Sequence, residues 1–209
     1  FIRTGAWQTF LLQVNMKQLL TITAILLTAF LTYAETAEEQ ESHRSKNKAR
    51  VEKLYQKQLN LFRKDPDKLV LPGLLADKKK KMISVQAEAT GLGAREIVEF
   101  FIISENSGHD YEALSVAFAK PSDIHKAIEF IGIHPGQGVD FKKMRFWPKG
   151  ERVTVSFLAP DSRNKKPVRA ERLILSEKTQ SPLPEYGMVF TGSAMIQDPD
   201  TLSGQPYYA

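Results

Sequence analysis

One strong helix pattern, set between short strand patterns, constrains the fold of this chain most. The segment 122–131 begins at Ser122, which can cap a helix, and ends before Gly132, which suits a left-handed C-cap. Its apolar residues share one helical face: Ile124, Ala127, Ile128 and Ile131. No regular alternation of strands and helices surrounds this segment. We therefore predict an α+β domain with a mainly antiparallel sheet and this segment as its principal helix.

Short apolar segments on both sides of this helix are typical of strands. Four consecutive lysines, Lys78 to Lys81, separate the first two and are expected at a hairpin turn, because connections between strands lie in solvent. Segments 151–160 and 166–177 alternate polar and apolar residues around a polar turn, which predicts a second hairpin. Segment 185–196 adds another strand. The β-branched and aromatic residues of 97–103 predict one more.

An apolar segment near the N-terminus predicts an export signal. Lys17 supplies a positive charge, residues 19–31 are apolar, and Thr32-Tyr33-Ala34 matches a small-residue cleavage site. The apolar run is shorter than the roughly 20 residues that span a bilayer. We expect a Sec-type signal peptide over 16–34, an extracytoplasmic protein (periplasmic or secreted), and no stable membrane span after cleavage. An uncleaved membrane anchor is the alternative.

This signal divides the chain into four parts. Residues 1–15 precede it and are interpreted as an upstream leader or artefact. Residues 35–66 combine a charged linker with an amphipathic helix over 47–64. Residues 67–209 form the α+β domain, for which truncation at the C-terminus is one interpretation. The predicted helix carries a stripe at helical spacing: Val51, Leu54, Tyr55, Gln58, Leu61 and Phe62.

Composition excludes several classes of site. The chain contains no cysteine, which rules out disulfides, iron–sulfur clusters, haem–thiolate ligation and a cysteine nucleophile. Its net charge of +5 is modest and is weak evidence for nucleic-acid binding. We expect no nucleic-acid partner. Gly91 and Gly93 lack the third glycine and the following helix of a dinucleotide-binding loop. No cofactor is expected, apart from a divalent metal in one alternative.

That alternative rests on segment 107–125, which holds two histidines, two aspartates and a glutamate. His109, Glu112 and His125 can supply three ligands to a zinc-type ion, and Glu112 can act as the general base of a hydrolase. Segment 111–119 fits a strand or a helix. On a helix His109 and Glu112 would share a side, and on a strand they would not, although His109 lies in the preceding loop and could turn toward either side. The competing interpretations are a structural polar cluster, with Glu112 paired to a nearby lysine, and an organic-ligand site.

A series of motifs resembles the YdjY-domain proteins, an uncharacterised bacterial group usually found behind export signals. In chain order the matching pieces are "GLLAD", "VQAEATG", "VEFF", a His-then-Glu-Ala-Leu element, "AKPSDIHKAIEFIGIHPG" and "VFTGS". The "KPSDIH…IEFIG" block is the most specific. The resemblance implies a secreted or periplasmic domain of unassigned activity, and it supplies no catalytic residue. Family members often have adjacent histidine and glutamate, whereas two residues separate His109 from Glu112 here.

These observations favour a non-catalytic binding or accessory module of the cell envelope. Its partner would be another envelope protein or a small ligand, and the helix over 47–64 is one candidate docking element. The metal-dependent site or hydrolase built on His109, Glu112 and His125 is the competing hypothesis. A structural envelope protein is a third.

Overall fold

The computed structural model describes residues 43–159, 166–192, 195–196 and 207–208. The chain divides into two compact units, residues 1–46 and 47–209, and the first is described only at 43–46. The predicted leader and signal peptide, residues 1–34, lie outside the described residues. In the part of the chain that is described, no helix is long and apolar enough to cross a membrane.

The N-terminal helix is described from residue 43 to residue 62, which confirms the helix predicted over 47–64 and starts it earlier. It stops before Asp65-Pro66, because the residue before a proline disfavours helical backbone. Near its start Lys48 forms an ion pair with Glu105, and Asn47 Nδ2 donates to Glu88 Oε2 at 3.1 Å. The predicted stripe is half-buried except at Leu61, which is exposed.

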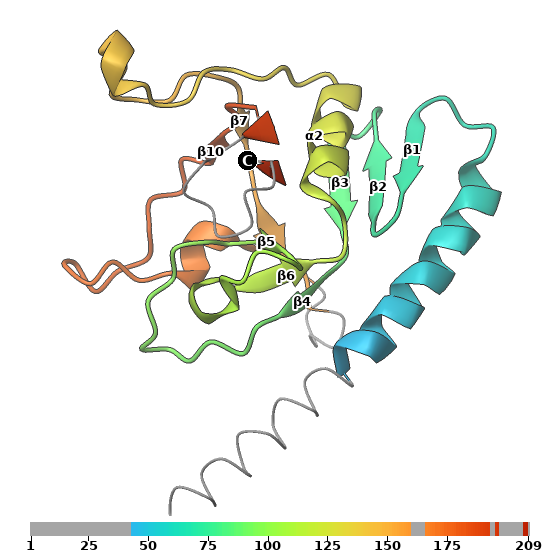
Figure 1. Cartoon of the computed structure of the whole chain (residues 1–209), viewed down its shortest axis with the longest axis horizontal. Coiled ribbons are helices and arrows are strands. Elements are labelled where there is room, and N and C mark those ends of the chain that lie inside the picture. The colour runs from blue at the N-terminus through green and yellow to red at the C-terminus, as the bar shows by residue number, and fades with distance from the viewer. Residues whose placement is uncertain (1–42, 160–165, 193–194, 197–206, 209) are drawn as a thin grey trace, which may run out of the picture. The chain divides into compact units, whose positions relative to one another are not determined.

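The first sheet is an antiparallel meander covered by the principal helix (Figure 1). Lys78 to Lys81 form the turn between its second and third strands, as predicted. Small and branched side chains of sheet and helix make the larger core: Leu74, Ala76, Ala119, Ala127 and Ile131. The elements are β1 (Lys68–Leu71), β2 (Leu74–Asp77), β3 (Met82–Val85) and α2 (Pro121–Phe130).

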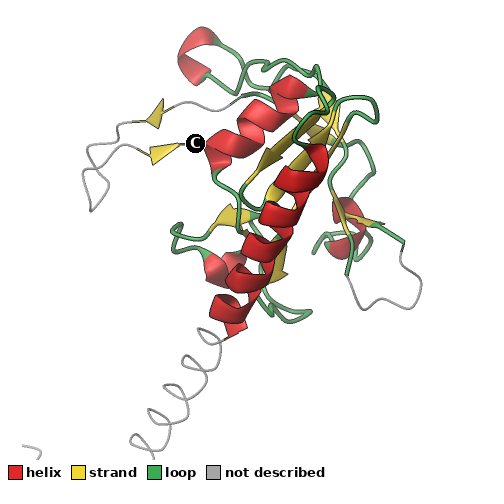
Figure 2. Ribbon diagram, turned by 90° about the vertical axis from the view of Figure 1, so that its right-hand side faces the viewer, coloured by secondary structure: helices red, strands yellow, loops and turns green. Residues whose placement is uncertain are grey.

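Helix α2 confirms the predicted helix with one correction at its start. Pro121 is the first helical residue, so Lys120 and not Ser122 holds the N-cap position. Proline suits the first helical position because its missing N–H would have no partner there. Gly132 follows the helix with φ +88°, as its predicted C-cap role requires. Figure 2 shows both helices alongside the strands.

The second sheet contains β4 (Ala87–Ala89), β6 (Ser115–Ala117) and β5 (Ile103–Ser104), in that order. β4 and β6 are antiparallel, whereas β5 and β6 are parallel. The predicted strand over 97–103 is wrong for most of its length. Apart from a single bridge at Phe100, only Ile103 of that segment belongs to a strand.

The remaining described strands form two-residue ladders. The predicted hairpin of 151–160 and 166–177 is present as a pairing of β8 with β9, and its turn lies partly outside the described residues. Beyond β9 the chain forms a 3₁₀ turn and does not continue as a strand. The elements are β7 (Arg152–Val153) paired with β10 (Met188–Val189), β8 (Ser156–Phe157) paired with β9 (Val168–Arg169), β11 (Met195–Ile196) paired with β12 (Tyr207–Tyr208), and the 3₁₀ turns η1 (Asp110–Glu112), η2 (Phe141–Lys143) and η3 (Ala170–Leu173).

Together these elements confirm the α+β class. Among the strands that the structure describes, all pairings are antiparallel except that of β5 with β6. Parallel neighbours need a long connection, and here that connection is residues 105–114. It carries two of the three residues singled out in the sequence, His109 and Glu112.

Candidate functional site

The connection from β5 to β6 is held in place by backbone hydrogen bonds to the segment before β5. The carbonyl of Glu112 accepts from the N–H groups of Glu99 at 2.8 Å and Phe100 at 3.1 Å. The N–H of Leu114 donates to the Phe100 carbonyl at 2.9 Å. Residues 99–100 therefore lie beside residues 112–114, although twelve or more positions separate them in the sequence.

His109 and Glu112 form a pair within this connection. Nδ1 of His109 lies 2.5 Å from Oε1 of Glu112. The 3₁₀ turn η1 explains the contact, because three residues per turn place positions i and i+3 on one side. Segment 111–119 is thus neither one strand nor one α-helix. It begins in a 3₁₀ turn and continues as β6.

Two aromatic rings flank the imidazole of this pair. The His109 ring centroid lies 5.6 Å from that of Phe100 and 5.9 Å from that of Tyr111, in tilted arrangements. Phe100, His109 and Tyr111 are exposed, whereas Glu112 is half-buried. We call Phe100, His109, Tyr111 and Glu112 the ring cluster. Such a cluster offers apolar contact area and a polar pair at one place.

The carboxylate of Glu112 also acts on its neighbour. Its negative charge raises the pKa of the Tyr111 phenol, and partial burial and a hydrogen bond with Glu112 act in the same direction. An ionised carboxylate only accepts hydrogen bonds, so Nδ1 of His109 is the donor in this contact. An imidazole oriented by a carboxylate is an arrangement used by general bases and by metal ligands.

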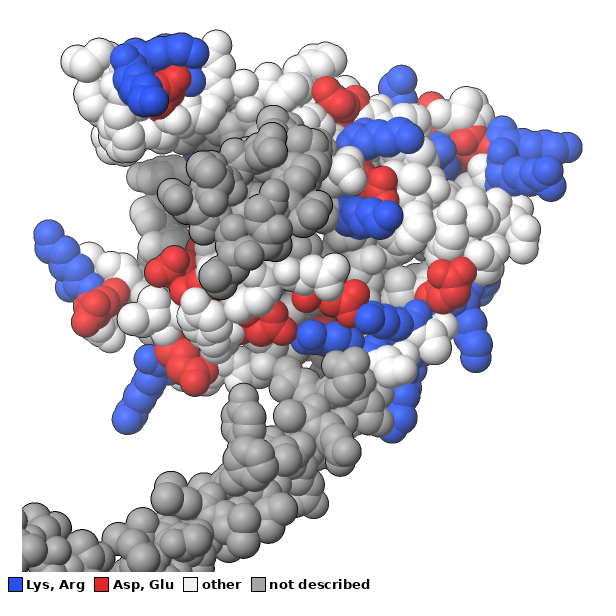
Figure 3. Space-filling view, viewed as in Figure 1, with Lys and Arg blue, Asp and Glu red and all other residues white. Residues whose placement is uncertain are grey.

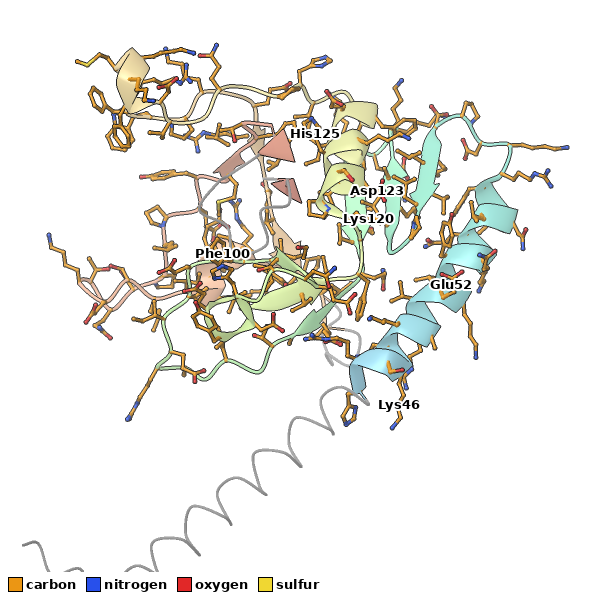
Figure 4. All side chains as sticks on the ribbon, viewed as in Figure 1. Lys46, Glu52, Phe100, Lys120, Asp123 and His125 are labelled. Carbon is orange, nitrogen blue, oxygen red and sulfur yellow. The ribbon has the colours of Figure 1, made fainter. Side chains whose placement is uncertain are left out.

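His125, the third predicted ligand, has other neighbours. It is half-buried on α2, where Nε2 lies 3.7 Å from Oε1 of Glu129. Its ring packs edge-on against the buried ring of Phe190, with centroids 5.3 Å apart. In Figure 4 His125 lies on α2, away from Phe100 of the ring cluster.

The structure therefore joins two of the three predicted residues. His109 and Glu112 are in contact, while His125 faces Phe190 and Glu129. Within the described ranges, no three His, Cys, Asp or Glu side chains gather so that they could hold a metal ion. Metal binding at His109 and Glu112 stays a prediction, and it would need further ligands beyond this pair.

Sequence reasoning missed the aromatic members of the site. The sequence pattern predicts that Phe100 lies within a strand, and it places Tyr111 in a segment that fits a strand or a helix. Neither residue carries a local signal of exposure, because β-branched and aromatic residues are also typical of buried strands. Their grouping depends on the pairing of residues 99–100 with residues 112–114.

Comparison with family models places most of this region in a known family. The model of the YdjY domain matches residues 74–204, which is more than half of the chain. The chain belongs to the YdjY domain family. The match starts at the first residue of β2 and includes the ring cluster and α2 of this YdjY domain. Comparisons with curated proteins and with solved structures give no match.

Proposed function

We propose that this YdjY domain is an exported, non-catalytic binding module of the cell envelope, and that it contacts a partner protein through the ring cluster. The observation that carries the proposal is the exposure of Tyr111 and Phe100 around the pair of His109 and Glu112. A group of exposed apolar side chains on a soluble domain is typical of an interaction surface.

The chemistry of the ring cluster suits a protein partner. Tyrosine supplies a large, rigid contact with a polar end, and it is among the residues that dominate binding energy at protein interfaces. Ile97 and Ile102, on the segment that carries Phe100, are also exposed. The hydrogen bonds between residues 99–100 and 112–114 hold this surface in shape before binding, which reduces the entropy lost on association.

Export is supported by the sequence pattern of residues 16–34. Cell fractionation and N-terminal sequencing of the native protein test this part of the proposal. The expected product starts near Glu35 and is found outside the cytoplasm. An intact leader on a cytosolic protein would contradict export.

Photo-crosslinking tests the binding surface. A benzophenone amino acid replaces Tyr111, which is 68% exposed, and in a matched control it replaces Tyr186, which is 74% exposed. Irradiation of the producing cells is expected to give a defined higher-mass adduct from position 111 and none from position 186. An adduct of small mass would instead identify a small ligand. Equal labelling at both positions, or none at position 111, would refute the assignment of this surface.

A metal-dependent site, in a hydrolase with Glu112 as general base, is the second candidate. The contact of His109 with Glu112 favours it, because the carboxylate orients the imidazole as in many metal sites. Metal analysis of tag-free protein tests it against the double variant His109→Ala, His125→Ala. Bound zinc in the parent that is lost in the variant would support the site. Equal, near-zero content in both proteins would refute it.

A further inference from the structure

Residues 137–149 form a narrow hairpin that we call the arm. Gln137 and Lys149 pair at its base through two backbone hydrogen bonds, of 2.6 and 2.9 Å. Asp140 and Arg145 pair near its end through two more, both of 2.9 Å. The 3₁₀ turn η2 closes the tip. Figures 1 and 2 show the arm extending away from the sheets and α2.

The arm holds its own shape. The Asp140 side chain caps η2 by accepting from the N–H of Lys143 at 3.2 Å. The guanidinium of Arg145 donates to the Gly138 carbonyl and, at 3.0 Å, to the Gln137 side chain. At the base Gly136 is required, because a Cβ there would lie 1.9 Å from the carbonyl oxygen of Lys149. These contacts keep the tip in one conformation before any ligand arrives.

The tip exposes large apolar side chains. Trp147 is 79% exposed and Met144 is 74% exposed. The rings of Phe141 and Phe146 are also exposed, and their centroids lie 6.0 Å apart. Large apolar residues gathered on a projection leave much apolar surface in water. A preformed projection of this kind is therefore expected to bury its tip in a partner.

Positive charge accompanies these rings. The arm carries three lysines and one arginine against a single acid, Asp140. Arg145 and Lys143 lie near Asp140, at 3.7 and 3.5 Å, whereas no ion pair is recorded for Lys142 and Lys149 within the described residues. Figure 3 shows lysine and arginine atoms at the end of the arm, next to uncharged surface. The tip thus combines aromatic rings with flanking cations.

We infer that the arm docks the domain on an anionic phospholipid bilayer. Tryptophan and phenylalanine favour the boundary between headgroups and acyl chains, and flanking lysines attract anionic headgroups. A convex, preformed tip suits a fluid interface, which needs no complementary groove. The docking is peripheral, through the tip of the arm. The inference does not depend on the ring cluster.

Fluorescence of the full chain tests this inference. The chain contains two tryptophans, Trp7 and Trp147, so the variant Trp7→Phe leaves Trp147 as the only one. Vesicles that contain phosphatidylglycerol are expected to shift its emission to the blue, and brominated acyl chains are expected to quench it. Pure phosphatidylcholine should give a much weaker response, and added salt should reverse the binding. The readout reports on the arm even if another segment binds the vesicle.

Two variants that lose the same charge distinguish binding through the lysines of the arm from attraction by the overall charge of the protein. Lys142→Gln with Lys143→Gln should raise the lipid concentration that gives half of the Trp147 emission shift about 30-fold, because each lysine near an anionic surface changes binding about fivefold. Lys80→Gln with Lys81→Gln, in the exposed turn between β2 and β3, should change this lipid concentration by less than about threefold. Circular dichroism checks that both variants fold.

Three results would overturn the inference. The first is an unchanged Trp147 emission on anionic vesicles. The second is an equal loss in the two charge variants, which would mean attraction by overall charge. The third is a shift with an acidic polypeptide such as polyglutamate but not with vesicles, which would assign the arm to an acidic protein surface.

Discussion

Glu171 is the most unusual single residue of the described structure, because it is a carboxylate with only 1% of its surface exposed. Arg169 binds it with two nitrogens, at 2.6 and 3.2 Å, and the N–H of Gly187 donates to it at 3.0 Å. Its own carbonyl accepts from Leu183 at 3.1 Å. One acidic residue thus fastens η3 to the segment that leads into β10.

These contacts make stability depend on pH. Hydrogen bonds from Arg169, then from backbone N–H groups, lower the pKa of Glu171 from 4.5 to about 2. A lowered folded-state pKa adds stability above the unfolded-state value, and this contribution is lost as the pH falls from 4.5 toward about 2. Glu171→Gln should therefore lower the urea midpoint of unfolding near pH 7, by an amount that shrinks toward about pH 2.

Urea unfolding at a series of pH values measures this difference. Glu177→Gln, on the exposed surface of the same region, is the control and should follow the parent protein at every pH. A gap between parent and Glu171→Gln that stays constant from pH 7 to pH 2 would show that the carboxylate is not held ionised by its contacts.

Tyr111 offers a direct test of the ring cluster. The charge of Glu112 raises the pKa of its phenol, so Glu112→Gln should lower that pKa toward its ordinary value. Ultraviolet titration of tyrosinate measures this, with Tyr111→Phe used to identify the signal of this phenol. Identical titration curves for the parent and Glu112→Gln would mean that the two side chains are not in contact in solution.

At this scale the contacts depend on local conformation that the sequence pattern left undecided between strand and helix. The contact of His109 with Glu112 follows from a spacing of three residues in a 3₁₀ turn. The place of His125 depends on how α2 packs against Phe190, which no local pattern encodes. The burial of Glu171 was missed for the same reason, since its partners are brought together by the tertiary structure.

Among the elements, the turn between β1 and β2 leaves little room for an added side chain. Gly73 has φ +70°, and a Cβ there would lie 2.9 Å from the carbonyl carbon of Phe118. Gly132, after α2, also has positive φ, but a Cβ there would meet nothing within 4 Å. A side chain at Gly132 would meet backbone strain alone, whereas a side chain at Gly73 would meet both backbone strain and steric conflict.

Gly73→Ala should reduce the free energy of unfolding by about 2–5 kcal/mol, because strain and overpacking add. Gly132→Ala should cost about 1–2 kcal/mol, from the left-handed backbone alone. Chemical denaturation of both variants measures the difference. Equal losses would show that the β1–β2 turn can move away from Phe118.

Patterns of apolar spacing predicted some elements and failed for others. Helix α2 was predictable because its apolar face, capping region and terminal glycine agree. Segment 97–103 has the composition of a strand, yet Ile97 and Phe100 are exposed and only its last residue enters a strand. Strand propensity reflects packing against neighbours, which the sequence of one segment does not contain.

As a whole, the described domain rests on two small cores and not on one continuous sheet. The larger joins β1, β2 and β3 to α2, and the smaller contains Ile103, Ala113 and Val116 around β6. Hydrogen bonds from Gln86 to Gly73 and from Phe118 to Gln86, of 2.8 and 2.9 Å, link the two. The α+β class was predictable from the order of patterns, whereas the division into two three-stranded sheets and separate two-stranded ladders was not.

Hydrogen exchange should reveal this division. Backbone amides of β2, β6 and α2 should exchange most slowly, because these elements line the cores. Amides of residues 91–98 and of the arm tip should exchange many times faster, and mass spectrometry of peptides measures this. Protection at the arm tip equal to that of β2 would contradict the picture of a projecting hairpin.

The parallel alignment of β5 and β6 has a further consequence for how such a domain can diversify. Two strands that point the same way need a return path between them, and the part of that path before Glu112 can vary in length and residues without shifting the ladder it joins. Here the return path bears the histidine–glutamate pair. Such a domain can therefore change the residues of this connection while the arrangement of its strands stays the same.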